Sequence, residues 1–452
     1  MKRRQFLFRA AAAGAGPLMA GSAALAARAT APGPADSCSS AAQAERLMGY
    51  SLAQLRDLYH RDLFIDWLPF MEQHVIDPEY GGFLCNTDFD GAHTDMNKEP
   101  LFEGRGIWVY STLYTRFGKD PRYLEVARRS VELLRSSEPQ DDALWCTGIH
   151  RDGSPAGPAG KVIPTDVGIA EGFAAYAQAT GKQEFLDRAR KLLRKCIRAY
   201  DRPDYNSAVG SGYFGPDAPS LPGARIMGSW MIMLRTAAQI LEMGPDAEFD
   251  RFARRCADAV IRHHFNPSFE LNNELLNRDF SRPAGPYAQL CNLGDTFEMT
   301  WMLLDEATRR RDEAMFSIGA DRLQRHLLAG WDAVYGGVFH NLLNVDENRY
   351  ELNKLLWAQE EVLVDTLYIY DRTSAAWAAE FFGRMYNYVR QRYPLTARGS
   401  PIWMYASGRK ATFAEFTGLR KRIENYHHPR HLIHNLLRLE SMTAPAKSQH
   451  RI

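Results

Sequence analysis

Apolar residues recur at three- and four-residue spacing through most of the chain, with charged residues between them. This is the pattern of amphipathic helices that bury one face. No long alternation of β-branched and polar residues appears, so we expect a helical protein. The pattern predicts helices at 123–137, 184–200, 229–243, 249–265, 295–310, 316–331 and 354–373.

Short glycine-rich segments separate the predicted helices, at residues 77–91, 207–218 and 331–346. The first and third both contain Tyr-Gly-Gly and an Asp-rich turn after it. Similar turns between paired helices indicate a repeat architecture, either an open solenoid or a closed ring of inner and outer helices. A solenoid usually binds a peptide along its concave face, whereas a closed ring makes one deep funnel.

The beginning of the chain has the layout of an export signal. Arg3 and Arg4 precede Gln-Phe-Leu, an Ala/Gly-rich stretch follows, and Ala24–Ala26 offers a cleavage site. Paired arginines favour the twin-arginine route, and the stretch is too short to span a membrane stably. We therefore predict a periplasmic or secreted protein. Its predicted parts are an export signal at 1–26, a linker at 27–43, one catalytic domain at 44–440 and a polar tail at 441–452.

Composition narrows the classes of partner. The chain has 452 residues, 45% of them hydrophobic, so it can bury a large core. A formal net charge of +1 gives no reason to expect nucleic acid or an anionic membrane surface. The six cysteines are scattered without a C-x-x-C pair, so neither a zinc site nor a disulfide framework is indicated.

Aromatic residues lie beside charged ones in several stretches. Arg105 and Trp108 are three apart and share a helix face, where a guanidinium could meet a hydroxyl-rich or anionic ligand. Alternatively, Arg105 is partly buried and pairs with Glu103 or another acid. Asp295 precedes an apolar helix and has Glu298 three residues later, which is also the pattern of a helix cap with a capping box.

Two later stretches contain further candidates for proton transfer. Trp357 and Glu361 are four apart in an apolar helix, and a carboxylate beside a buried Trp has a raised proton affinity, as a general acid needs. Residues 425–435 then combine four histidines, which could form a metal site, an acid/base or a polar helix start. These histidines are His427, His428, His431 and His434.

In this order, the stretches resemble the N-acylglucosamine 2-epimerase family, which includes cellobiose 2-epimerases and mannose-type aldose–ketose isomerases. The motif Q/E-x-R-x-x-W matches 103–108, and G-H-x-x-E-x-x-W matches 294–301 except at Asp295. K-x-W-W-x-Q-x-E matches at Lys354, Trp357, Gln359 and Glu361. A W-x-x-Y…G segment fits 403–410, and F/Y-H-x-P-R matches 426–430.

The resemblance implies an all-α (α/α)6 barrel with short β segments in its loops, which selects the closed ring. It implies a metal-free site without a cofactor, a small-molecule carbohydrate substrate, no nucleic acid and no membrane insertion after signal removal. We expect a monomer or a homodimer.

The resemblance also suggests residue roles. His427 would be the principal acid/base with Asp295 as its partner, and Arg105 and Glu361 would polarise or hydrogen-bond the sugar carbonyl and hydroxyls. His431 and His434, on the helix that follows, would be structural. The residues expected to bind substrate are Glu298, Trp357, Trp403, Arg430 and Trp108.

One departure bears directly on function. Family enzymes typically have histidine where this chain has Asp295, and the helix at 225–241 has no histidine either, as in the acylglucosamine epimerases. An ordinary Asp, with a pKa of about 3.9, is a weak base for removing a proton next to a carbonyl. We therefore expect a carbohydrate 2-epimerase or aldose–ketose isomerase. The alternatives are a glycoside hydrolase or lyase that uses Asp295, or a protein that binds sugar without turnover.

Overall fold

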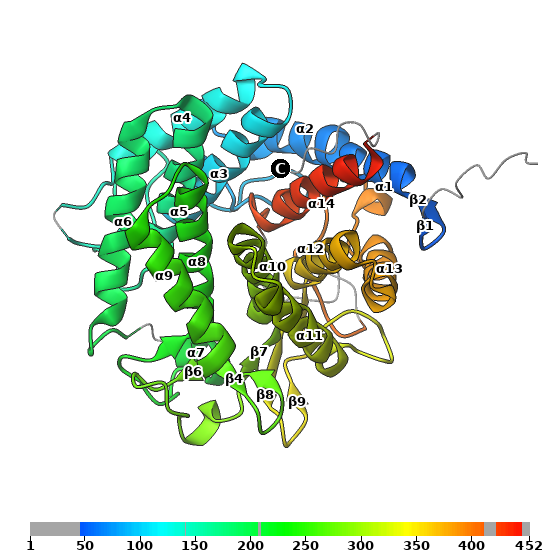
Figure 1. The fold of residues 1–452 in the computed structure, drawn as a ribbon. Helices are drawn as coiled ribbons and strands as arrows, with labels where there is room; N and C mark the ends of the chain where they lie inside the picture. Colours follow the sequence, from blue (N-terminus) through cyan, green and yellow to red (C-terminus); the bar gives the residue numbers. More distant parts are fainter. Residues whose placement is uncertain (1–45, 141, 207–208, 411–421, 445–452) are drawn as a thin grey trace, which may run out of the picture. The chain divides into compact units, whose positions relative to one another are not determined.

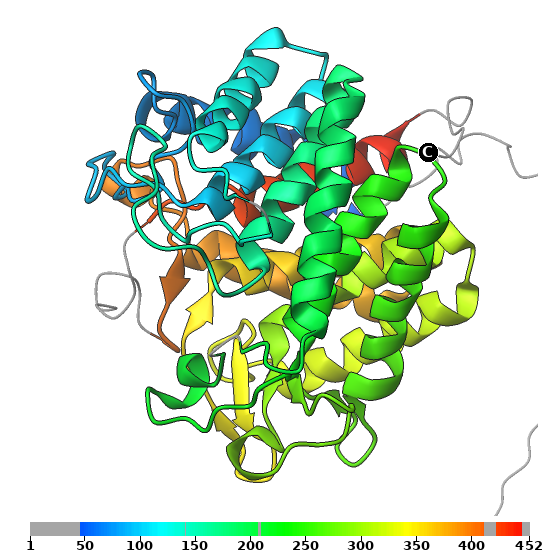
Figure 2. The same ribbon diagram turned by 90° about the vertical axis from the view of Figure 1, so that its left-hand side faces the viewer.

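The long helices alternate along the chain between an outer and an inner layer. The computed structural model describes residues 46–140, 142–206, 209–410 and 422–444 (Figures 1 and 2). In these ranges the inner helices are α3 (Pro100–Arg116), α5 (Pro164–Thr180), α8 (Met227–Glu242), α10 (Leu293–Arg310), α12 (Leu356–Thr373) and α14 (His427–Thr443). The outer helices are α1 (Leu52–Arg61), α4 (Pro121–Arg135), α6 (Gln183–Asp201), α9 (Ala247–Asp258), α11 (Glu313–Gly330) and α13 (Ala376–Arg392).

The inner helices close into a ring. Each of them packs against the next inner helix, and α14 contacts α3. The first outer helix, α1, packs against the last inner helix, α14, where the amide of Asn435 donates a hydrogen bond of 3.0 Å to the Tyr59 hydroxyl. The fold is therefore the predicted (α/α)6 barrel, and the open solenoid is excluded.

Sequence patterning sorts the helices into the two layers. Inner helix α5 is buried along most of its length, whereas outer helices α6 and α9 bury one face and expose charges on the other. The seven predicted helices are all present within three residues of their expected ends, except that 249–265 finishes as a π-helix at Ala259–His264. Helix α5 was not predicted, because it has no polar face that would produce a periodic pattern.

Short strands lead into three inner helices. β3 (Arg225–Ile226), β7 (Cys291–Asn292) and β10 (Lys354–Leu355) end where α8, α10 and α12 begin. β3 pairs with β6 (Leu275–Leu276), and β10 pairs with β11 (Ala406–Ser407). β7 pairs with β8 (Asn341–Asn344), which pairs with β9 (Arg349–Tyr350). These antiparallel pairs hold loops over the N-terminal ends of the inner helices.

Smaller elements complete the described chain. The segment at 207–218, expected to be a glycine-rich connection, contains the short helix α7 (Val209–Phe214), which ends before Gly215 at φ +85°. The others are β1 (Arg46–Leu47), β2 (Tyr50–Ser51), β4 (Phe265–Asn266), β5 (Leu271–Asn272), α2 (Leu68–Phe70), π-helices at Asp62–Trp67 and Met71–Val75, and 3-10 helices at Gly285–Tyr287 and Thr396–Arg398.

The two Tyr-Gly-Gly segments fold alike. In the first, buried Lys98 forms an ion pair of 2.9 Å with Asp77; in the second, buried Lys354 forms an ion pair of 2.9 Å with Asp332. Each aspartate also accepts backbone N–H groups of its own turn. The repeat seen in the sequence is therefore a repeat of one turn structure, which locks a loop onto the barrel.

Two motif residues belong to these turns rather than to the site. The Phe83 N–H donates to Glu103 Oε1 at 2.9 Å, and the Val338 N–H donates to Gln359 Oε1 at 2.8 Å. Glu103 and Gln359 are both fully buried. Their place in the family motifs reflects the need to satisfy a buried backbone N–H in each repeat.

The predicted domain ends are only partly visible. Helix α14 continues to Thr443, three residues beyond the predicted domain end at 440. The export signal and linker lie outside the described residues, as does most of the predicted tail. No helix in the described ranges is long and apolar enough to cross a membrane. The five cysteines described are buried and free.

Candidate active site

His427 occupies the first position of α14, at the rim of the helix ring. Its Nδ1 lies 2.7 Å from Glu424 Oε1, and its Nε2 lies 3.5 Å from Glu298 Oε1. The imidazole stacks on Trp357, with ring centroids 5.2 Å apart and planes 25° apart. The ring is thus held between two carboxylates and against an aromatic face.

These carboxylates set the protonation state of the histidine. Burial alone lowers the pKa of His427, but the negative charges of Glu424 and Glu298 outweigh burial and raise the pKa to about 9. Conversely, the pKa of Glu424 falls to about 2: burial opposes ionisation, and the positive charges of His427 and Arg105 overcome it. At neutral pH the site therefore holds an imidazolium ion, which is a proton donor.

Arg430 joins two acidic residues beneath this ring. Its Nη2 forms an ion pair of 2.7 Å with Glu298 Oε1 and a second ion pair with Glu361 Oε1. The Trp301 indole donates to Glu361 Oε2 at 2.8 Å. Burial raises the pKa of Glu361 to about 7; the positive charge of Arg430 opposes this rise, and the negative charge of Glu298 adds to it. For Glu298 the balance is reversed, because the charge of Arg430 overcomes burial and holds the pKa of Glu298 well below its usual range.

The position of Glu361 requires a correction. Its side chain is fully buried and both oxygens are engaged by Arg430 and Trp301. A contact with the sugar carbonyl, as the sequence suggested, does not fit this burial. Glu361 instead lies beneath the site, where it accepts hydrogen bonds from Arg430 and Trp301.

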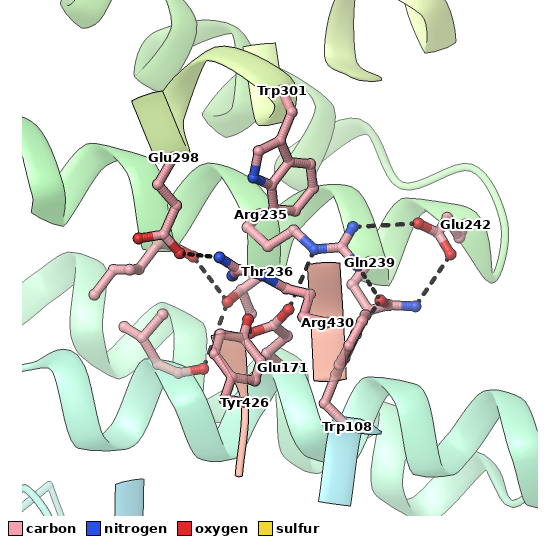
Figure 3. Close-up of polar contacts among 12 residues, drawn as sticks. Trp108, Glu171, Arg235, Thr236, Gln239, Glu242, Glu298, Trp301, Tyr426 and Arg430 are labelled. Atoms are coloured by element: carbon pink, nitrogen blue, oxygen red, sulfur yellow. Dashed lines mark hydrogen bonds and ion pairs between the residues drawn. The ribbon is translucent and has the colours of Figure 1, made fainter. Parts of the chain in front are cut away.

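The floor of the barrel is a continuous polar network (Figure 3). The Tyr426 hydroxyl donates to Glu171 Oε2 at 2.9 Å, and Arg235 Nε donates to Glu171 Oε1 at 3.2 Å. Arg235 Nη2 and the Trp108 indole both donate to Gln239 Oε1, at 3.0 and 3.1 Å. Trp108, predicted to bind substrate, is 2% exposed and lies within this floor.

Arg105 is connected to the histidine through a shared acid. Its Nη1 donates to Glu424 Oε1 at 3.0 Å, and its guanidinium lies 4.7 Å from the centre of the Tyr426 ring. The alternative pairing with Glu103 is not found, because Glu103 accepts from the Phe83 N–H and from Ser130. Arg105 thus lies beside the site but is paired with another acid, Glu424, as the alternative expected.

Asp295 lies in the first turn of α10, but it is not the cap. Asn292 is the N-cap, and its side chain accepts the Asp295 N–H at 2.9 Å. The expected capping box of Asp295 and Glu298 is therefore wrong: the capping signal lies three residues earlier. The Asp295 carboxylate packs against Gly228, where an added Cβ would lie only 2.4 Å from Oδ2.

The surroundings of Asp295 make it a better base than an ordinary aspartate. Burial, and then the charge of Glu298, raise the pKa of Asp295 to about 6, while positive charge on His340 and His427 opposes this rise. The side chain remains partly exposed. Asp295 therefore lies within the electrostatic reach of His427, although the two residues come from different helices.

Trp357 and Trp403 both border a small cavity of about 30 Å³, to which Glu424 and His428 also contribute. Both Trp side chains are partly exposed. Their rings provide the flat apolar faces on which sugars stack. The structure brings these two predicted substrate-binding residues together at one cavity.

The other histidines of the cluster have separate partners. His428 Nδ1 and His431 Nδ1 lie 2.5 and 3.1 Å from Glu360 Oε1, and His434 stacks on Trp108 with centroids 6.0 Å apart. The family resemblance implies a metal-free site, yet carboxylates do accompany these histidines. Ligand atoms within 4.8 Å of one another come from Glu360, His428 and His431, and from Glu298, Glu361 and His427.

Two residues beside the catalytic candidates were missed from the sequence. Glu424 is three residues before His427, a spacing that could have identified it as a partner. His340 follows the second Tyr-Gly-Gly turn and reaches Asp295 only because β8 pairs with β7. Nothing in its sequence surroundings could have found it.

Comparison with known proteins identifies the family of this chain. The family model described as N-acylglucosamine 2-epimerase (GlcNAc 2-epimerase) matches residues 81–417, most of the chain. The chain belongs to the N-acylglucosamine 2-epimerase family. The Bos taurus N-acylglucosamine 2-epimerase is 25% identical over 338 residues, which cover 72% of this chain and 77% of that protein.

Solved structures share the fold. The cellobiose 2-epimerase from Bacillus thermoamylovorans B4167 superposes with a TM-score of 0.72 at 17% identity, over 85% of this chain and 100% of that chain. A D-mannose isomerase superposes with a TM-score of 0.66 at 13% identity, over 86% of this chain and 97% of that chain. Family and fold together identify a carbohydrate epimerase or isomerase, and they do not favour the hydrolase or binding-only alternatives.

Removing the charge of Glu424 tests whether this carboxylate keeps His427 protonated. In Glu424→Gln the amide keeps the shape but removes a negative charge, so the pKa of His427 should fall. Its folded value of about 9 lies above the unfolded value. Activity that needs the imidazolium is therefore present at low pH and lost as pH rises. The basic limb of kcat/KM should move down by about one pH unit or more.

The matched control is Glu380→Gln, which changes an exposed carboxylate on α13. Its pH profile should coincide with that of the unmodified protein. A Glu424→Gln profile with an unmoved basic limb would show that His427 does not control this limb.

Proposed function

We propose that this protein interconverts C2 epimers of a reducing sugar, or the corresponding aldose and ketose, with Asp295 and His427 as the proton-transfer pair. Asp295 removes the C2 proton from the open-chain sugar. His427 returns a proton to the opposite face of C2 for epimerisation. For isomerisation it returns the proton to C1, while the O2 hydroxyl proton passes to O1 and the carbonyl forms at C2.

The observation that carries this proposal is the opposite charge of the two groups at neutral pH. With a pKa raised to about 6, Asp295 is largely ionised yet more basic than a free aspartate; with a pKa raised to about 9, His427 is protonated. Environments that separate the pKa values of two facing groups define a base and an acid. The raised pKa of Asp295 offsets the absence of the family histidine.

The remaining residues hold this pair in place. Glu424 and Glu298 keep His427 charged and oriented, and Arg105 and Arg430 keep these two carboxylates ionised. Both the donor and the acceptor of the proton are side chains, so the proposed reaction uses no metal. The floor network beneath them is buried and hydrogen-bonded, which suits a site that must not rearrange during proton transfer.

The substrate we propose is a neutral mono- or oligosaccharide with a free reducing end. Trp357 and Trp403 offer stacking faces, and the carboxylates around them accept hydrogen bonds from hydroxyl groups. Relatives named for N-acylglucosamine, cellobiose and mannose act within this class and define the panel to test.

Variants of the pair test the function directly. His427→Asn and Asp295→Asn each remove a titrating group with little change of volume, and each should lower turnover by roughly 10²–10⁴-fold, as is typical of general acid–base groups. The assay is incubation of reducing sugars in deuterated water, with NMR detection of deuterium at C2. Both variants should unfold within a few degrees of the unmodified protein. Activity within threefold of the parent in either variant would remove that residue from the mechanism.

We also propose that the protein is exported by the twin-arginine route. Support comes from Arg3 and Arg4 before Gln-Phe-Leu and from Ala24–Ala26. Replacing both arginines by lysine keeps the charge and should leave the full-length chain inside bacterial cells, whereas the unmodified chain should reach the periplasm or medium and lose its first residues. Equal export of both proteins, measured by fractionation and N-terminal mass spectrometry, would contradict the proposal.

A further inference from the structure

The proposed reaction requires a group that has not yet been assigned. When the C2–H bond breaks, its electron pair forms the C1–C2 double bond, and the carbonyl electron pair moves onto the oxygen. The new negative charge needs a hydrogen-bond donor. Of the two residues predicted for this task, Glu361 is buried beneath the site, and Arg105 is paired with Glu424.

His340 lies at the start of α10, beside Asp295. Its backbone oxygen accepts the N–H groups of Leu293 and Gly294, at 2.9 and 3.1 Å, which ties it to the first turn of the helix. A Cβ on Gly294 would lie 2.6 Å from the Cδ2 of His340, so this glycine leaves the space that the ring occupies. The His340 side chain remains 17% exposed.

The imidazole of His340 also borders the same tryptophan as His427. It meets Trp357 edge-on, with centroids 5.3 Å apart and planes 80° apart, while His427 stacks on the face of that ring. Positive charge on either histidine lowers the pKa of Asp295. His340 and His427 therefore border one tryptophan, and both lie near enough to Asp295 for their charge to act on it.

The hydrogen bonds behind His340 fix its tautomer. Asn341 Nδ2 donates to Glu351 Oε2 at 2.6 Å, and because an ionised carboxylate only accepts, this contact fixes the orientation of the amide. The same Nδ2 lies 3.0 Å from His340 Nδ1, and an Nδ1 that accepts this hydrogen bond leaves the ring proton on Nε2. A proton on Nδ1 would face the amide N–H.

Nε2–H is then the donor of the ring. The polar contacts found for this ring among the described residues are both made by Nδ1. Nearby acidic groups are Glu351, 3.5 Å from Nδ1 on the far side of the ring, and Asp295 on the near side. An imidazole N–H that donates in this way can polarise a carbonyl without surrendering its proton.

We propose that His340 is a catalytic residue that donates the Nε2–H hydrogen bond to the carbonyl oxygen of the open-chain sugar while Asp295 takes the C2 proton. The C2–H bond breaks, the proton passes to an Asp295 oxygen, and the enediolate oxygen accepts a stronger hydrogen bond from His340. His427 then supplies the returning proton, and exchange with solvent restores Asp295 and His427. This role rests on the proposed epimerase or isomerase function.

Two substitutions at one position test the donor. His340→Phe keeps a ring of similar size but removes the N–H, and it should lower kcat by roughly 10²–10³-fold, as loss of one oxyanion donor does. KM should change little, because the bond strengthens in the transition state. His340→Gln retains a side-chain N–H and should recover at least about tenfold of the loss. The rate of C2 deuterium exchange should fall by the same factor as kcat, since enediolate formation is the slowed step.

The matched control is His150, an exposed loop histidine whose Nδ1 also contacts an asparagine, Asn97, at 3.2 Å. His150→Phe and His150→Gln should retain full activity. If His340→Phe stays within threefold of the unmodified protein, or if His340→Gln loses as much as His340→Phe while folded, the role of His340 is overturned and the proposed function stands. If the unmodified protein exchanges no C2 hydrogen on any sugar of the panel, the proposed function itself is overturned and the role of His340 with it.

Discussion

The guanidinium of Arg430 is the charge on which the site depends. It is 1% exposed and neutralises Glu298 from α10 and Glu361 from α12. Two carboxylates buried so close together cannot both ionise without a cation, because desolvation and mutual repulsion favour protonation. Arg430 keeps Glu298 ionised, and Glu298 in turn helps keep His427 protonated. Since Arg430 lies three residues after His427 on α14, one helix face presents both the acid and the charge that sustains it.

The barrel places the negatively charged Asp295 near the positively charged His427. Asp295 and His427 lie in the first turns of α10 and α14, and Trp357 lies in the first turn of α12. A helix N-terminus stabilises negative charge, so the position of Asp295 favours its ionised form, while burial and Glu298 push its pKa upward. The balance of these effects gives a base suited to neutral pH, in a chain that lacks histidine at this position.

Sequence reasoning succeeded where information is local. Helical periodicity located most of the barrel, and the short family motifs identified His427, Glu298, Arg430 and Trp357 as candidate site residues, which the ring of helices then brings together. It failed where partners come from distant segments: Glu351 and Asn341 orient His340 through the β7–β8–β9 sheet, and no pattern within one segment reveals this. It also misread burial. Glu361 and Trp108 have the residue types of a sugar site, yet the closed ring buries both side chains below it. The helix cap was also assigned to the wrong residue, since Asn292 rather than Asp295 caps α10.

The proposed chemistry needs His427 to be an imidazolium ion at neutral pH, held by two carboxylates. NMR titration of protein labelled at the histidine ring carbons measures this charge directly, with the His427 signal assigned by its loss in His427→Asn. This signal should titrate with a pKa of about 9. A midpoint near the ordinary histidine value of about 6.5 would rule out His427 as the proton donor, because the ring would then be neutral where the reaction needs its proton.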